Sequence, residues 1–218
     1  MASFRENVEP SHFKARAKSQ STIIVGISQS IADECDVFGF ACGTLRSHFR
    51  TLNDMGDFLT RSTIWISIAA YTFGCVVFAR GRAQNDRWAR VAWTVGCTAL
   101  LAHFICAFQF FHSWSHASAY AETARQTADV FGINWGGGIF INYAVAVLWI
   151  GDVASWWIAG LSSYRSRPWS LILIWHGFLI FIIFNATVVF GHGLTRWIGI
   201  VVTLCLCVCW VVINRRRS

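Results

Sequence analysis

Two histidines one helical turn apart have the spacing in this chain that best suits metal chemistry. His112 and His116 lie in a polar segment between two long apolar runs, within the sequence FHSWSHASAY. Alanines are frequent after His112 and proline is absent, so we expect the chain to continue as a helix that Gly132 and Gly136 end. On that helix the two imidazoles lie about 40° apart on one face and could share a metal ion.

Two ligands do not make a metal site, so further ligands have to come from elsewhere. His192 follows the fourth apolar run and lies on the same predicted side of the membrane, and Glu122 or Asp129 could complete the shell. Imidazole and carboxylate ligands of this kind suit zinc, iron or copper. The predicted metal ligands are His112, His116, His192 and Glu122.

An ordinary surface helix explains the same residues without a metal. Histidines tolerate the headgroup zone of a membrane, and the pairs Glu122–Gln126 and Arg125–Asp129 have the i, i+4 spacing of partners on a solvated helix face. An HxxxH spacing without the intervening glutamate of the zinc protease motif carries no mechanism by itself. Both interpretations of the segment stay open.

Asp152 and His176 lie inside apolar runs, where an ionisable side chain is costly without a partner. Counted from the ends of their runs, both residues lie roughly 10 Å from the same membrane surface. We therefore expect a carboxylate and imidazole pair. Such a pair could relay a proton, orient a ligand or fix helix packing through a hydrogen bond.

His103 lies at a different depth from His176. The difference is roughly 9 Å at helical rise, which disfavours the two histidines as opposite axial ligands of one haem. We expect His103 instead to join a polar patch in the external half of the bundle, facing a lipid or quinone-like substrate. The other members of this patch are Gln109, Asn142, Tyr143 and Asn185.

The elements that position these residues are apolar helices. The 218 residues are 55% hydrophobic and 13% charged, with a mean hydropathy of +0.48, whereas charged residues make up about a quarter of a soluble protein. About five runs approach the roughly 20 apolar residues that a membrane-spanning helix needs. We expect an all-α membrane protein, a bundle of about five transmembrane helices with an external interfacial helix between the second and third spans. The runs are Thr63–Ala79, Val91–Phe111, Gly138–Ala159, Trp169–Phe190 and Trp197–Ile213.

The arginines predict the orientation of this bundle. Because cytoplasmic loops are enriched in basic residues, the side with most arginines is expected to be cytoplasmic. We therefore expect a cytoplasmic C-terminus, an external segment from His112 to Gly138, and a location in the inner membrane. The net charge of +7 then reports topology and not nucleic-acid binding, because no basic stripe is interleaved with aromatics. Nine of the twelve arginines beyond residue 60 lie on the predicted cytoplasmic side: Arg80, Arg82, Arg87, Arg90, Arg165, Arg167, Arg215, Arg216 and Arg217.

The first sixty residues differ in composition from the rest. They contain both lysines, with six basic and seven acidic side chains, whereas all twelve tryptophans follow residue 60. Three carboxylates, at Asp33, Glu34 and Asp36, make it costly for the mildly apolar stretch around them to span a membrane. We expect residues 1–60 to be an N-terminal tail, disordered or preceding a biological start at Met55, and residues 61–218 to form the transmembrane domain.

The middle third of the chain contains the block WSHASAYAETARQTADVFGINWGGGIFINY, followed by a tryptophan-rich third span. This block resembles a group of uncharacterised bacterial multi-pass membrane proteins. The resemblance excludes residues 1–60. It implies a polytopic membrane protein and brings no known activity.

Three functional classes fit these observations. A metal-binding or redox-type membrane protein with an external histidine site is the prediction, and a non-catalytic subunit or assembly partner of other membrane subunits is the alternative. A proton-coupled transporter using Asp152 and His176 is disfavoured, because five spans do not divide into two equal repeats. No Walker, Rossmann, serine-hydrolase or zinc protease motif identifies an enzyme.

Overall fold

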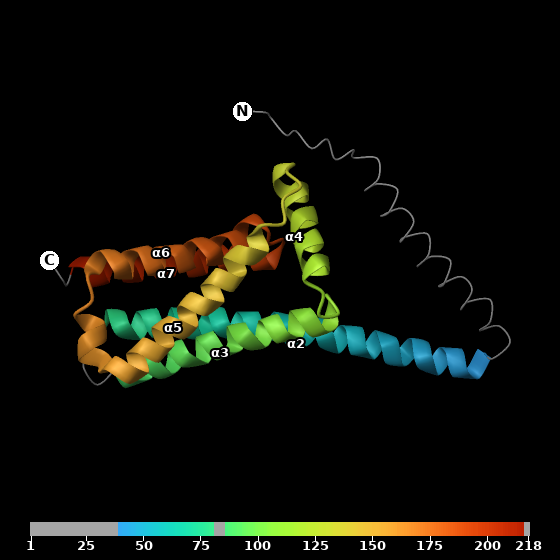
Figure 1. Ribbon diagram of the computed structural model, residues 1–218, viewed down its shortest axis with the longest axis horizontal. Coiled ribbons are helices and arrows are strands. Elements are labelled where there is room, and N and C mark those ends of the chain that lie inside the picture. Colours follow the sequence, from blue (N-terminus) through green and yellow to red (C-terminus); the bar gives the residue numbers. More distant parts are fainter. Residues whose placement is uncertain (1–38, 81–85, 216–218) are drawn as a thin grey trace, which may run out of the picture. The chain divides into compact units, whose positions relative to one another are not determined.

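The computed structural model describes residues 39–80 and 86–215, and every regular element in those two ranges is a helix. The chain divides into two compact units, Met1–Asp54 and Met55–Ser218. The second unit carries the features described below (Figure 1). The elements are α2 (Gly39–Ala79), α3 (Asp86–Phe110), α4 (His116–Phe131), α5 (Gly138–Arg165), α6 (Trp169–Phe184), the π-helix η2 (Asn185–Val189) and α7 (Leu194–Arg215).

Helix α2 begins before the region predicted to be transmembrane. Residues 39–60, which the sequence placed in an N-terminal tail, are helical, and residues 1–38 of that predicted tail lie outside the described residues. The boundary between the compact units falls between Asp54 and Met55. The proposed biological start at Met55 stays a prediction.

Within residues 39–80 and 86–215, five helices are long and apolar enough to cross a membrane, as the sequence predicted. Each has a mean hydropathy of 1.5 to 2.4 over its most apolar window. The predicted boundaries agree with these segments to within a few residues, except that the first begins nine residues before Thr63. The segments are Asp54–Ala79, Arg87–Phe110, Gly138–Gly160, Ser170–Val189 and Leu194–Arg215.

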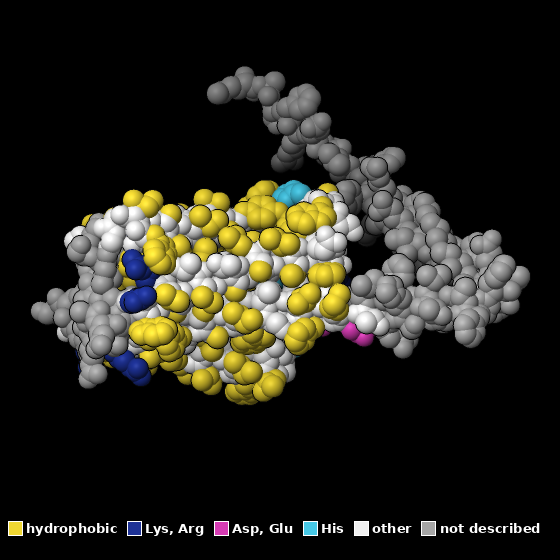
Figure 2. Space-filling view, turned by 90° about the horizontal axis from the view of Figure 1, so that it is seen from below, with side chains coloured by type: hydrophobic (Ala, Val, Ile, Leu, Met, Phe, Trp, Pro, Cys, Tyr) yellow, Lys and Arg dark blue, Asp and Glu magenta, His cyan; other side chains and the backbone are white. Residues whose placement is uncertain are grey.

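Apolar side chains cover the outside of the bundle as well as its inside. Ile158 is 87% exposed, and Val147 and Ile174 are each 68% exposed. Figure 2 shows apolar side chains spread over the face between the two ends of the bundle. Monomeric soluble proteins rarely expose apolar surface on this scale. This surface suits a multi-pass membrane protein surrounded by lipid.

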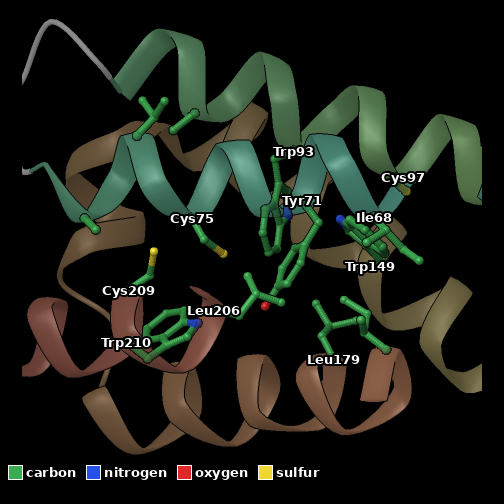
Figure 3. Packing of buried hydrophobic residues seen from close by; sticks show 14 of the residues in the cluster. Ile68, Tyr71, Cys75, Trp93, Cys97, Trp149, Leu179, Leu206, Cys209 and Trp210 are labelled. Atoms are coloured by element: carbon green, nitrogen blue, oxygen red, sulfur yellow. The ribbon is translucent and has the colours of Figure 1, made fainter. Parts of the chain in front are cut away.

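The centre of the bundle is built from aromatic side chains. Tyr71 and Leu206 are fully buried, with no exposed surface. The ring centroid of Tyr71 lies 5.1 Å from that of Trp93 and 5.8 Å from that of Trp149, within the range of favourable aromatic pairs. Figure 3 shows these three rings between the ribbons, with Leu206 and Trp210 of α7 nearby. Large rigid rings therefore hold together helices that are apolar on every face.

The expected helical continuity through His112 is wrong. Helix α3 ends at Phe110, and Ser113 and Trp114 adopt left-handed φ angles of 47° and 59°. The Trp114 amide donates to the Phe108 carbonyl at 3.1 Å, which closes the end of α3. Ser115 then accepts a hydrogen bond from the Ser118 amide at 3.3 Å and starts α4. Serine competes with a continuing helix because it satisfies the free amides of a new one.

The other two irregularities of the bundle also redirect the chain. Gly160 has φ 75° and ψ 175°, values that favour glycine, so α5 is broken there before the chain turns toward α6. Helix α6 ends in the π-helix η2, against which α7 packs. The Thr187 hydroxyl in η2 donates back to the Ile183 carbonyl at 2.7 Å. Short π-helical segments inside α-helices are frequent at functional sites.

Candidate functional site

The two ends of the bundle differ in charge. The arginine end, where α2, α5 and α7 finish and α3 and α6 begin, carries the described arginines Arg80, Arg87, Arg90, Arg165, Arg167 and Arg215. The opposite end, which we call the α4 end, holds His112, His116 and His192. Figure 2 shows the dark blue basic side chains gathered at one end and a cyan histidine toward the other.

His112 and His116 do not form the helical pair that their spacing predicted. The left-handed residues between them place only His116 on α4. His116 Nδ1 hydrogen-bonds the Tyr143 hydroxyl at 3.0 Å, and the His112 ring packs against Phe108 with centroids 5.7 Å apart. His116 therefore joins α4 to α5.

Glu122 is occupied by its neighbours on α4. Its Oε1 lies 2.6 Å from Arg125 Nη2 and accepts a hydrogen bond from Gln126 Nε2 at 2.9 Å. The hydrogen bond from Arg125, aided by Gln126 and the positive charge of Arg125, holds the pKa of Glu122 below its ordinary value. The Glu122–Gln126 pair of the ordinary surface helix is confirmed.

His192 lies exposed between η2 and α7. Within residues 39–80 and 86–215, no group of three or more His, Cys, Asp or Glu side chains could hold a metal ion. A zinc, iron or copper site made of His112, His116, His192 and Glu122 stays a prediction without support from this geometry.

The predicted polar patch is divided among separate contacts. His103 Nδ1 hydrogen-bonds the Thr60 carbonyl of α2 at 2.9 Å. Gln109 Oε1 accepts from the Trp114 indole at 2.9 Å, while Tyr143 contacts His116 as described above. The remaining members, Asn142 and Asn185, line a common pocket.

This pocket, the α4 pocket, is a cavity of about 430 Å³ between α4, α5, α6 and η2. Its volume lies within the range of roughly 300 to 1,000 Å³ that is typical of small-molecule sites. Helix α4 contributes four residues at helical spacing, so one face of α4 covers the pocket. The lining residues are Thr123, Gln126, Thr127, Phe131, Trp135, Gly138, Ile141, Asn142, Phe181, Ile182, Asn185, Ala186 and Phe190.

The polar groups of the α4 pocket are uncharged. The Thr123 and Thr127 hydroxyls donate to backbone carbonyls of α4 at 2.9 Å and 2.8 Å, which leaves their oxygen atoms as acceptors. Asn185 Nδ2 donates to the Phe181 carbonyl at 2.7 Å. The Asn142 amide is exposed and has no hydrogen-bond partner among the described residues. That amide can offer two N–H donors and one oxygen acceptor to a bound molecule.

Asp152 is the centre of a second polar group, toward the arginine end. Asp152 is buried, and its carboxylate accepts a hydrogen bond from Trp93 Nε1 at 2.9 Å and from Arg167 Nη1 at 2.5 Å. Arg167 Nη2 also donates to the Ser155 hydroxyl. A buried charge needs such partners because its desolvation is costly.

His176 and Asp152 are linked through Trp93. The Trp93 indole donates to Asp152, and its ring lies 5.0 Å from the His176 ring between centroids. His176 Nδ1 hydrogen-bonds the Tyr71 hydroxyl at 3.2 Å, and the Trp210 ring lies 4.2 Å from His176. The direct carboxylate and imidazole pair stays a prediction, while these contacts favour a role for both residues in helix packing.

Tyr71, Trp93 and Arg167 are the members of this group that sequence reasoning missed. Arg167 was counted only as a topology signal, although Pro168 follows it and forces a turn that brings it back over α5. Trp93 and Tyr71 looked like any other aromatic residue of an apolar run. A comparison of depths in the membrane would have identified Trp93 as a partner of Asp152, because both residues lie toward the arginine end of their helices.

No protein-family model, curated protein or solved structure matches this chain. The resemblance of its middle third to bacterial multi-pass membrane proteins therefore stays a prediction. The α4 pocket is the feature whose size and chemistry best support a function.

Proposed function

We propose that this chain is a multi-pass membrane protein that binds an uncharged amphipathic molecule in the α4 pocket. The observation that carries the proposal is the combination of amide and hydroxyl groups with aromatic and aliphatic walls around one cavity of about 430 Å³. Small-molecule sites typically consist of an apolar pocket with a few polar groups that fix orientation. The π-helix η2 supplies Asn185 and Ala186 to the wall, which adds the local irregularity common at such sites.

The lining favours a ligand with a neutral head. Among the described residues of the pocket wall, none carries an ionisable side chain. A charged headgroup would lose its hydration on entering the pocket and would find no side chain of opposite charge there. That desolvation costs several kcal/mol or more. A hydroxyl or carbonyl head can exchange hydrogen bonds with Asn142 and the threonine oxygens. The proposed class therefore includes long-chain alcohols, monoacylglycerols and quinones.

Charges at the two ends support an orientation with the arginine end in the cytoplasm. The described arginines of the α4 end each have a local partner: Arg61 pairs with Asp57 at 2.8 Å, Arg125 with Glu122 at 2.6 Å, and Arg196 Nε donates to the Val188 and Gly191 carbonyls, both at 3.1 Å. Among the described arginines of Met55–Ser218, these three are the ones at the α4 end, and all the others lie at the arginine end. By the positive-inside rule we place that end in the cytoplasm, with α4 on the external side of an inner membrane.

Native mass spectrometry of the full chain with 1-monolauroylglycerol tests the binding proposal. We expect one bound molecule per chain, and about five-fold weaker binding to Asn142→Leu, since a lost neutral hydrogen bond costs about 1 kcal/mol. Asn214→Leu is the matched control, because Asn214 lies near the end of α7 at the arginine end.

The control variant should bind as the unchanged protein does. Equal binding to all three proteins, or no saturable binding to the unchanged protein, would refute a site at Asn142. Elemental analysis of the same preparation, beside His116→Ala, tests the separate prediction of a metal at the α4 end.

A further inference from the structure

A second cavity lies beside the α4 pocket, nearer the middle of the bundle. This inner cavity has a volume of about 60 Å³ and is lined by residues of α2, α3, α5, α6 and η2. Most of its wall is aliphatic, including Ile64, Leu100 and Leu179, and the rings of Tyr71 and Trp149 also line it. Figure 3 shows Leu179 and Trp149 near Tyr71 in this part of the core.

The inner cavity continues the α4 pocket along the bundle axis. Ile182 and Ala186 line both cavities. Along α5 the wall passes from Ile141 and Asn142 in the α4 pocket to Val145 and Trp149 in the inner cavity. The separation of eight positions between Ile141 and Trp149 corresponds to about 12 Å along the helix.

Helix α6 and η2 give the same order as α5. Phe190 lines only the α4 pocket and Leu179 only the inner cavity, while the two linings overlap from Phe181 to Ala186. Both antiparallel helices therefore have the α4 pocket toward the α4 end and the inner cavity toward the arginine end. At the boundary Ala186 contributes only a methyl group beside the larger side chain of Ile182, so the passage between the two spaces is narrowest at Ile182 and open on the Ala186 side.

The wall of the inner cavity suits hydrocarbon better than water. Its two oxygen-bearing side chains already bond elsewhere: the Ser67 hydroxyl donates to the Gly96 carbonyl at 2.8 Å, and the Tyr71 hydroxyl bonds His176 at 3.2 Å. A cavity with apolar walls tends to stay dry and to accept apolar guests. Its small volume suits one flexible chain and excludes a fused ring system or a second chain.

We propose that the ligand is a linear amphiphile with one hydrocarbon chain, whose neutral head lies at Asn142 and whose chain passes Ala186 into the inner cavity. This inference rests on the proposed function of the α4 pocket and adds the class and direction of the ligand. Tyr71 and Trp149, which are 0% and 4% exposed, form the closed inner limit. The accommodated chain length therefore has a maximum.

Photolabelling of the full chain with two monoacylglycerol probes tests this arrangement. One probe carries a diazirine next to the glycerol head, and the other carries it at the chain terminus. Peptide mapping should place the head label on residues of the α4 pocket and the terminal label on Val145, Trp149 or Ile183. Ala186→Phe should reduce terminal labelling at these residues several-fold, whereas Ala154→Phe, at an exposed position of α5, should not.

The outcomes separate the two proposals. Head labelling in the α4 pocket together with terminal labelling of exposed residues such as Leu173 and Ile174 would overturn the inner-chain arrangement and leave the α4 pocket intact. Absence of head labelling from the pocket would overturn the proposed function itself.

A second measurement covers the case in which Ala186→Phe does not fold. Affinity of the unchanged protein for saturated monoacylglycerols should rise with chain length and then fall once the chain exceeds the inner cavity. A continuous rise across the series would contradict a closed inner limit.

Discussion

At the scale of single residues, Asp152 is a buried carboxylate of the bundle, and its partners come from two directions. Trp93 donates from α3 at 2.9 Å, and Arg167 donates from the turn before α6 at 2.5 Å. The Asp152 side chain is 7% exposed, whereas that of Arg167 is 31% exposed. Arg167 can therefore be rehydrated more easily than Asp152 when the pair is broken.

Removing both charges together should destabilise the protein by less than the sum of the two single removals. We expect Asp152→Asn or Arg167→Gln each to lower the free energy of unfolding by up to about 3 kcal/mol, because the remaining charge loses its partner. The smaller loss should belong to Asp152→Asn, since Arg167 is partly solvated. In a denaturant titration, the double variant should lose less free energy of unfolding than the two single variants lose in total. Strict additivity would contradict an ion pair.

The Trp93 indole N–H should matter independently of its ring. Trp93→Phe keeps an aromatic side chain beside Tyr71 and His176 but removes the donor to Asp152, so we expect a loss of about 1.5 to 3 kcal/mol. Trp157→Phe is the matched control, because its indole donates to the Thr94 hydroxyl at 2.9 Å from a side chain that is 51% exposed. The midpoint temperature of thermal unfolding should be clearly lower for Trp93→Phe than for Trp157→Phe. Equal midpoint temperatures would show that the buried hydrogen bond contributes nothing to stability.

At the scale of elements, the contact between η2 and α7 depends on the absence of a side chain. Gly199 is buried in α7, and a Cβ atom there would overlap the Thr187 side chain of η2. Thr187 is held in place by its hydrogen bond to the Ile183 carbonyl. The π-helix that supplies Asn185 and Ala186 to the α4 pocket is therefore supported from behind by α7.

A methyl group at Gly199 should separate these two elements. We expect Gly199→Ala to cost about 1 to 3 kcal/mol of stability, because overpacking forces the backbone to shift. The matched control is Gly177→Ala in α6, where nothing lies within 4 Å of the added atom; this change should be neutral or stabilise by up to about 1 kcal/mol. Hydrogen exchange of η2 amides should increase only in Gly199→Ala, and unchanged exchange would refute the support role of α7.

At the scale of the whole molecule, the five helices are apolar outside and inside, and apart from Asp152 the charged side chains of the described spans lie toward their ends. Only 28% to 39% of each span's most apolar window is buried inside the protein, so most of each window keeps some apolar surface that other parts of the chain do not cover. Lipid is the solvent that suits the remainder, because it removes exposed apolar surface from water. The unequal ends then decide which way the bundle faces.

Reporter fusions should show the arginine end in the cytoplasm. A green fluorescent protein fused after the C-terminus should be fluorescent, and alkaline phosphatase at the same position should be inactive. Phosphatase inserted after Gly132, at the end of α4, should be active. The reverse pattern would overturn the orientation. Phosphatase activity at both positions would indicate that the chain crosses the membrane an even number of times between Gly132 and the C-terminus, and not the three times that α5, α6 and α7 predict.

Residue type and order alone determined the number of helices and their character. A run of apolar residues long enough to cross a membrane predicts a span without any knowledge of the rest of the fold. Within the described residues, the structure contains five such helices. The Gln126 partner of Glu122 was also predictable, because it lies within the same helix at a spacing of four residues.

Only the tertiary structure decided which distant polar groups meet. His112 and His116 were separated by left-handed residues at Ser113 and Trp114, and the predicted patch around His103 was divided among three contacts. The α4 pocket formed because α4 turns one face toward α5, α6 and η2. Apolar periodicity says nearly nothing about the rotation of a helix that is apolar on every face, so those neighbours follow from packing between helices and not from spacing along the chain.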